Sequence, residues 1–262
     1  MKTKISRMKF IQNVFWFLLI IIFWEVSSRL NLVNQYLLPP FSKVAERLVL
    51  ELFTGYLGLQ VLNSLKLVIL GVLMSFGLAS IIALMCICSK TIESLVSALC
   101  TIFNPLPGIA VLPLLMIWFG VGNGIMLALI VHGVLWPLTT NLLVGFRSIP
   151  TVYKEWAKNI GLSPVNSLLH VQIFSVMPYL VAGLRVGWGR AWRALIGAEM
   201  VFGMIGTVGG VGYYIYTNRA YANVTNVFSG VIVIIVIGIL VEQAFRLLEK
   251  NTTVKWGMSD ES

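Results

Sequence analysis

Six long apolar stretches constrain this chain more than any other feature of its sequence. They lie at about 11–30, 62–88, 94–119, 123–146, 174–202 and 224–247. A helix needs roughly 17–25 apolar residues to cross the hydrocarbon core of a bilayer, and each stretch provides them. Only 11% of the residues are charged, against about 25% in soluble domains. The sequence therefore predicts an all-α membrane protein with six transmembrane helices over residues 11–248.

The first stretch also has features of a signal peptide. Four basic residues within 1–10 precede an apolar run over 11–24, as in the first two regions of such a peptide. The Val26-Ser27-Ser28 sequence that follows is a poor small-residue cleavage site. We therefore interpret the stretch as a retained first span and residues 1–10 as a tail.

The distribution of basic residues predicts the orientation, because cytoplasmic loops carry an excess of Lys and Arg. With six spans the side of the termini holds Lys2, Lys4, Arg7, Lys9, Lys90, Arg147, Lys154, Lys158, Arg246, Lys250 and Lys255. The other side holds only Arg29, Lys43, Arg47 and Arg219. We expect a multi-pass inner-membrane protein with both termini, including the tail 249–262, in the cytoplasm. The net charge of +9 then reflects topology and not nucleic-acid binding.

Residues 31–60 are too polar to span and are expected to form an external amphipathic segment. Pro39-Pro40 should end the first helix, because proline lacks the N–H donor and restricts the residue before it. Ser42 could then cap a short helix. One face of that helix would carry apolar residues at four-residue spacing, namely Val44, Leu48 and Leu52.

Two of the spans carry local signals of packing. The second span has small residues at four-residue spacing, which predict a face where helices approach closely: Gly71, Ser75 and Ala79. The third span contains three prolines, which predict a kinked helix inside the bundle: Pro105, Pro107 and Pro113.

The loop at 147–173 predicts a docking surface for another protein. Pro150 should open and Gly161 should close a helix of about ten residues, because proline favours helix starts and glycine the position after the end. Ser163-Pro164 reads as the cap and first position of a second short helix. Two short helices in a basic loop exceed what a simple channel requires.

The same loop carries a family resemblance. Its Glu155-Trp156-Ala157, followed by Gly161, Val171, Ile173 and Pro178, resembles the EAA loop of ABC importer permeases. Trp156 replaces an alanine of that pattern, and Phe174 replaces a proline. The runs at 183–200 and 37–44 are similar to permeases of the nitrate, sulfonate, taurine and bicarbonate group.

The resemblance implies a type I importer permease that pairs with a second permease copy, usually identical. It implies ATPase coupling through the loop at 151–163, with Glu155, Trp156, Ala157, Gly161 and Pro178 as the coupling residues. It also implies an external solute-binding protein. No Gly-Lys pair, and so no phosphate-binding loop, occurs in the chain. ATP and Mg²⁺ are therefore expected in a cytoplasmic partner ATPase, with no cofactor bound by this chain.

The fifth span carries ionisable residues, which are functional candidates at membrane depth. At about 100° per residue, one stripe contains Arg185, Trp188, Trp192 and Glu199. We expect this stripe to line the translocation pathway. Arg190 and Arg193 fall on another side, so changing Arg190 should harm uptake less than changing either tryptophan. The structural alternative is that Arg185 reaches the interface and Glu199 pairs with a neighbouring helix.

No constellation of nucleophile, base and orienting acid is present, and His132 reads as a packing residue, so no catalysis is expected. Cys86, Cys88 and Cys100 have no metal-ligand spacing around them. The resemblance implies a permease for a small anion such as a sulfonate, taurine, nitrate or bicarbonate. Import of a pyrimidine or thiamine-type precursor, and a secondary transporter driven by an ion gradient, remain alternatives.

Overall fold

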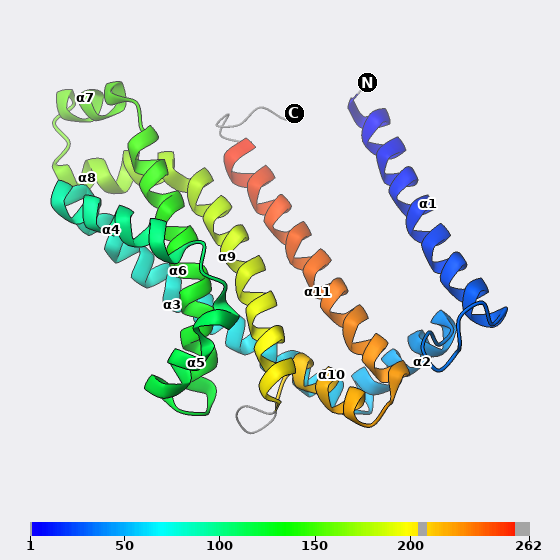
Figure 1. Ribbon diagram of the computed structural model, residues 1–262. Helices are drawn as coiled ribbons and strands as arrows, with labels where there is room; N and C mark the ends of the chain where they lie inside the picture. The colour runs from blue at the N-terminus through cyan, green and yellow to red at the C-terminus, as the bar shows by residue number, and fades with distance from the viewer. Residues whose placement is uncertain (1, 204–208, 255–262) are drawn as a thin grey trace.

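The computed structural model describes residues 2–203 and 209–254, and these ranges form helices and connections without a strand (Figure 1). The elements are α1 (Lys2–Arg29), α2 (Phe41–Phe53), α3 (Leu57–Cys88), α4 (Lys90–Phe103), α5 (Gly108–Phe119), α6 (Asn123–Ser148), α7 (Thr151–Asn159), α8 (Pro164–Ser167), the π-helical turn η1 (Leu168–Gln172), α9 (Ile173–Phe202), α10 (Val211–Ala220), α11 (Val224–Glu249) and the π-helical turn η2 (Lys250–Val254).

Four helical segments in the described part are long and apolar enough to cross a bilayer: α3, α6, the continuous stretch Pro164–Phe202 and Val224–Thr252. The bent pair α4 and α5 adds a fifth if it forms one span. Helix α1 covers the predicted first span, although the side chains of residues 1–11 lie outside the described ones. The arrangement is all-α and compatible with the six predicted spans. The predicted tail 1–10 is helical from Lys2, and most of the tail 249–262 lies outside the described residues.

The third span departs from its prediction. Residues 94–119 do not form one kinked helix, because α4 and α5 meet at an angle of 107°. Pro105 and Pro107 lie in the break, where each removes a backbone donor. Pro113 stays inside α5 without ending it. Helix α4 starts at the end of the molecule that carries α7, and α6 starts at the opposite end (Figure 1), as expected if the broken pair forms one span.

The centre of the bundle is built from α3, α6 and α9, which pack closely along their small residues. Gly71, Ser75 and Ala79 of α3 are all buried, as the spacing predicts. A Cβ atom at Gly71 would lie 2.4 Å from Cγ2 of Ile130 on α6. The predicted packing face of the second span is therefore confirmed, and its partner is α6.

The connection between α1 and α3 begins near the predicted position, but a different residue ends the helix. Helix α1 ends at Arg29, where Asn31 takes a positive φ of 53° and the Leu32 N–H donates to the Ser27 carbonyl at 3.1 Å. This left-handed cap ends the helix, so the prediction that Pro39-Pro40 end it is wrong. Residues 57–60 belong to α3 and not to this connection.

Helix α2 contains the predicted apolar face, but its start is different. Pro40 occupies the N-cap position, and Ser42 caps nothing. Instead the Ser42 hydroxyl donates to the Glu25 carboxylate of α1 at 2.8 Å. Val44 is fully buried, and the other two predicted apolar residues, Leu48 and Leu52, pack against the core. The apolar face of α2 thus rests on the protein, where α2 contacts α3 and α11.

Candidate functional site

The predicted coupling helix forms as α7, between Pro150 at its N-cap and Gly161 just after its end. Gly161 has φ +77°, a left-handed conformation that favours glycine. The Leu162 N–H donates to the Ala157 carbonyl and the Gly161 N–H to the Lys158 carbonyl, both at 3.0 Å. This pair of bonds is a Schellman motif. The start and the end predicted for this helix are confirmed.

Helix α7 presents an apolar face to the outside of the chain. Val152, Tyr153, Trp156 and Ile160 are all exposed and fall within about 100° of one another around the helix. Trp156 is 56% exposed, whereas Ala157 is fully buried against the domain. Large exposed apolar patches mark interaction sites. The replacement of alanine by Trp156 therefore places a large side chain in the middle of this face.

The remaining predicted coupling residues lie apart from that apolar face. Glu155 is exposed on α7 outside it. Pro178 lies inside α9 and belongs to the bundle. Both positions are compatible with the motif, but only the residues of α7 can contact a partner together. Whether any of them couples to an ATPase stays a prediction.

The second short helix is not separate, which corrects its prediction. Ser163 caps α8 as expected, since its side chain accepts from the Asn166 N–H at 3.3 Å. Helix α8 then continues through η1 into α9 without a break. A mid-helix π-turn often marks a functional site. The loop that carries α7 is therefore joined directly to the helix that carries the intramembrane charges.

Arg185 begins the predicted pathway stripe and forms ion pairs inside the chain. Its guanidinium contacts the carboxylates of Glu242 and Glu249, both in α11, with a distance of 3.1 Å between Nη1 and Glu249 Oε1. Glu242 also accepts from Arg246 at 3.4 Å. Arg185 thus joins α9 to α11. The alternative, in which its side chain extends to the membrane interface, did not include these ion pairs.

Glu199 ends the stripe in a closed polar contact. Its side chain is 3% exposed and accepts from the Gly212 N–H at 2.8 Å and the Ser64 hydroxyl at 3.2 Å. The Val211 N–H donates to Ser64 at 3.0 Å. Glu199 and Ser64 therefore satisfy backbone donors in the first turn of α10, donors that a helix start leaves without intrahelical partners.

The tryptophans of the stripe stack on each other, with ring centroids of Trp188 and Trp192 6.3 Å apart and planes 8° from parallel. Trp192 is buried and Trp188 is half-buried. All four residues do share one side of α9, but that side is turned toward neighbouring helices. Their predicted role as a pathway lining stays untested, and Trp192 and Glu199 have little surface to offer a solute.

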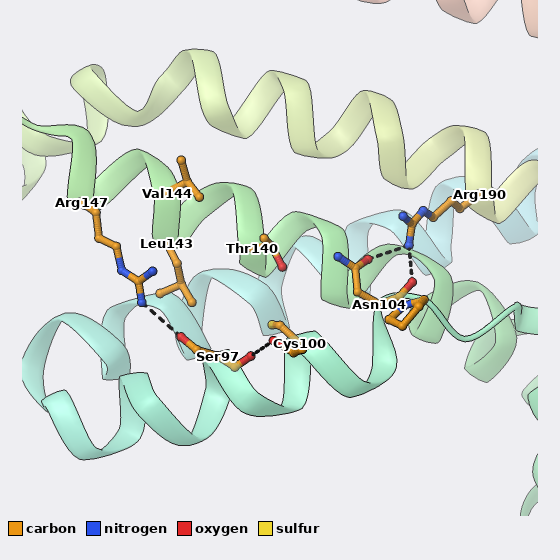
Figure 2. A pocket seen from close by; sticks show the side chains of 10 residues that line it. Ser97, Cys100, Asn104, Thr140, Leu143, Val144, Arg147 and Arg190 are labelled. Atoms are coloured by element: carbon orange, nitrogen blue, oxygen red, sulfur yellow. Dashed lines mark hydrogen bonds between the residues drawn. The ribbon is translucent and has the colours of Figure 1, made fainter.

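The other side of α9 borders two adjoining pockets of about 490 Å³ and 380 Å³. They share Asn104, Pro105 and Arg190, and we call them together the basic groove. Figure 2 shows the larger pocket, with Arg147 and Arg190 near its two ends and α4, α6 and α9 around it. The polar residues that line the groove are Ser97, Thr101, Asn104, His132, Thr140, Arg147, Arg190 and Arg193. None of the described lining residues is acidic.

Arg190 points toward the break between α4 and α5 (Figure 2). Its Nη1 donates to the Asn104 carbonyl at 2.9 Å and to Oδ1 of the same residue at 2.7 Å. The break frees carbonyl groups that no helical N–H reaches, and the guanidinium binds one of them. Only one of its nitrogens is used in these bonds, which leaves the rest of the planar fork facing the groove.

Arg193 and His132 complete the charged and polar character of the groove. Arg193 is exposed and makes no hydrogen bond or ion pair within the described chain. Both ring nitrogens of His132 are buried and likewise lack a partner among the described residues. The His132 ring packs edge-on against Phe103, with ring centroids 6.4 Å apart, and it also lines the groove. Sequence reasoning gave these residues little weight, although charge within a span is itself a functional signal.

The helices and their apolar spans define the class of this chain as a polytopic membrane protein. Residues 76–254 match the family described as the binding-protein-dependent transport system inner membrane component. This match covers well over half of the chain. The chain belongs to that family, whose type I permease fold the resemblance implied.

Relatives within the family carry different solutes in their names. The chain is 28% identical to the taurine transport system permease protein TauC of Escherichia coli over 90% of this chain and 86% of the relative. It is 30% identical to the putative aliphatic sulfonates transport permease protein SsuC of Bacillus subtilis, over 92% of this chain and 86% of the relative. The formylaminopyrimidine transport permease protein ThiX of Halalkalibacterium halodurans is 25% identical over 94% and 96%.

Proposed function

We propose that this chain is the permease subunit of an ATP-driven importer and that a small anion crosses along the basic groove. The observation that carries the proposal is the pair Arg190 and Arg193 on an open side of a membrane-spanning helix. Charged side chains at that depth are costly and face a bundle interior or a water-filled path. That side of α9 is therefore assigned to a path between two permease copies, and not to lipid.

The chemistry of the groove supports an anionic solute. A guanidinium presents a rigid planar set of donors that matches carboxylate and other oxyanion geometry. Asn104 and Thr140 add neutral hydrogen-bonding groups beside Arg190, and no described lining residue would repel an anion. Sulfonates, nitrate and bicarbonate all present oxygens that this fork can bind. The pathway therefore follows Arg190 and Arg193, while the stripe of Arg185 and Glu199 holds the helices together.

The partners follow from the two ends of the molecule. With both termini in the cytoplasm, the exposed apolar face of α7 docks a cytoplasmic ATPase, which binds and hydrolyses ATP with Mg²⁺. A solute-binding protein delivers the anion to the opposite end, where α2 and α10 lie (Figure 1). Because α8, η1 and α9 are continuous, movement of the docked loop would be transmitted to the helix that carries Arg190.

Reconstitution of the chain with its ATPase and solute-binding protein in proteoliposomes tests the proposal. We expect ATP-dependent uptake of an oxyanion. Arg190→Gln should strongly lower this uptake while the ATPase stays bound to the permease. Trp156→Ala should release the ATPase, since a central aromatic residue at an interface contributes about 2 kcal/mol or more. Phe53→Ala, which removes an even more exposed aromatic side chain in α2, is the matched control and should retain the ATPase. Uptake driven by an ion gradient without ATPase would contradict the proposal.

A neutral pyrimidine precursor is the second candidate solute. It is favoured by the similarity to ThiX over nearly the whole length of both chains and by the amide and hydroxyl groups in the groove. Competition of formylaminopyrimidine against a sulfonate separates the two. Uptake of the neutral compound that is unchanged by Arg190→Gln would overturn the anion assignment and keep the importer class.

A further inference from the structure

A second basic pocket lies beside α7, at the ends of the spanning helices. It has a volume of about 210 Å³, and its polar lining consists of Lys90, Glu93, Arg147, Lys154 and Gln172. Lys90 starts α4, Lys154 belongs to α7, and Gln172 ends η1. Four separate elements, counting α6 with its Arg147, thus bring their polar side chains to one place at the ends of the spanning helices.

The charges of this pocket do not cancel. Glu93 is its one acidic residue among those described, and it accepts from Nε of Arg147 at 2.7 Å. Lys90 and Lys154 make no ion pair or hydrogen bond within the described chain. Lys154 is exposed and lines the pocket, and its position on α7 lies roughly 150° around the helix from the middle of the apolar docking face. The apolar docking face of α7 is on the other side.

An apolar pocket of about 150 Å³ adjoins the basic one, and Phe146 lines both. Its other walls include Phe76 and Ala83 of α3, Leu142 of α6 and Leu180 of α9, and Ser80 is the only hydroxyl among the described lining residues. The length of α3 from Phe76 to its end at Cys88 is about 18 Å, at a helical rise of 1.5 Å per residue. That length is close to one leaflet of hydrocarbon, roughly 15 Å.

We propose that these two pockets form a site for one anionic phospholipid. The phosphate lies between Lys90 and Lys154, and an acyl chain follows the apolar pocket into the bilayer. Basic pockets between membrane helices bind anionic headgroups, and the shared wall at Phe146 gives this pocket the polarity of a phospholipid from end to end. The bound phosphate would join α7 to the start of α4, so the lipid would stiffen the helix that presents the docking face.

The competing occupant is the transported solute, because the basic pocket also shares Leu143 and Arg147 with the basic groove. An exit route for the solute would need charged and hydrated walls, but it would not need an apolar pocket beside it. The pocket instead leads to a wall of Phe76, Leu142 and Leu180 that no small anion would use. The geometry therefore favours a lipid.

Native mass spectrometry of the full-length chain, purified and exposed to an equimolar mixture of phosphatidylglycerol and phosphatidylcholine, tests the site. We expect preferential retention of phosphatidylglycerol. Lys90→Gln with Lys154→Gln should lower that retention about thirtyfold, since each lysine near an anionic headgroup contributes about fivefold. Ser80→Trp, which fills the apolar pocket without changing charge, should also lower it. Lys250→Gln, a lysine of η2 outside the pocket, is the matched control and should leave it unchanged.

Equal retention of the two lipids by the unmodified chain would overturn the site. So would a double lysine variant that retains phosphatidylglycerol but loses uptake, because that result would assign the pocket to solute exit. Folding is monitored by the thermal transition of each variant, and Ser80→Trp reports on the site independently of the lysines. The retention measurement itself involves no transport, and uptake is measured only for a double lysine variant that still retains the lipid, so failure of the site and failure of the proposed import function are distinguishable.

Discussion

The two sides of α9 carry similar residues in opposite circumstances. On one side Arg185 and Glu199 are enclosed by partners from α11, α3 and α10. On the other side Arg190 uses one nitrogen to hold Asn104, and Arg193 makes no bond within the described chain. The difference teaches that a charge in a span indicates function most strongly when its hydrogen-bonding capacity is not consumed by the fold.

The largest effect is expected on the enclosed side. Glu199→Leu would leave the Gly212 N–H and the Ser64 hydroxyl without their acceptor in a buried place. Each such group costs about 1–3 kcal/mol, so we expect a loss of about 3 kcal/mol and a fall in unfolding temperature of roughly 6–12 °C. Thermal unfolding in detergent measures it.

Glu199→Gln is the matched control, because its amide oxygen can still accept from Gly212, and it should lose less than half as much. A Glu199→Leu variant that unfolds like the original chain but no longer transports would reverse the comparison. That result would support the prediction from helical angles, in which the stripe that contains Glu199 lines the pathway.

The next effect is expected on the open side. Arg190→Gln should lower uptake at low solute concentration about thirtyfold, because a hydrogen bond to a charged group contributes about 1.5–3 kcal/mol. Arg190→Lys keeps the charge but not the planar set of donors, so its uptake should lie between that of the original chain and that of Arg190→Gln. Arg185→Gln should instead lower the unfolding temperature, since it leaves Glu242 and Glu249 without their shared cation. Normal uptake in Arg190→Gln would exclude this side of α9 as the path.

Much of this architecture follows from the sequence because local physics decides it. Apolar length alone placed the spans at α3, α6, α9 and α11, since the bilayer requires it. Pro150 and Gly161 placed α7, because backbone conformation at these residues is restricted or permissive whatever surrounds them. The small residues at Gly71 predicted a close approach, although not that Ile130 would supply the contact.

What the sequence left undecided depends on tertiary partners. Pro105 and Pro107 predict a disturbance, but the 107° turn also involves Arg190, which binds the Asn104 carbonyl from another helix. Helical angles correctly grouped Arg185 with Glu199, yet they give only relative positions around an axis. Which side of α9 meets the groove depends on partners more than 50 residues away in the sequence, such as Glu242.

A smaller effect is expected at Arg193. Arg193→Gln should raise KM for an anionic solute about fivefold, with kcat and the unfolding temperature unchanged, because the side chain has no partner to lose. Surface substitutions of this kind usually change stability by less than about 0.5 kcal/mol. Since exposed charges are screened by salt, the difference should shrink as ionic strength rises. A KM that does not depend on salt concentration in the original chain or in Arg193→Gln would contradict an electrostatic role of Arg193.

The smallest effect is expected at Trp188. Phenylalanine keeps an aromatic ring against Trp192, and the indole N–H of Trp188 has no partner within the described chain, so Trp188→Phe removes no hydrogen bond. Uptake should stay within about twofold, a change below 0.5 kcal/mol, and the unfolding temperature should shift by no more than about 2 °C. Trp118→Phe in α5, an exposed tryptophan, is a control for the general cost of losing an indole. A tenfold loss of uptake in Trp188→Phe at unchanged stability would mean that the tryptophan contacts solute, because packing alone could not separate the two measurements.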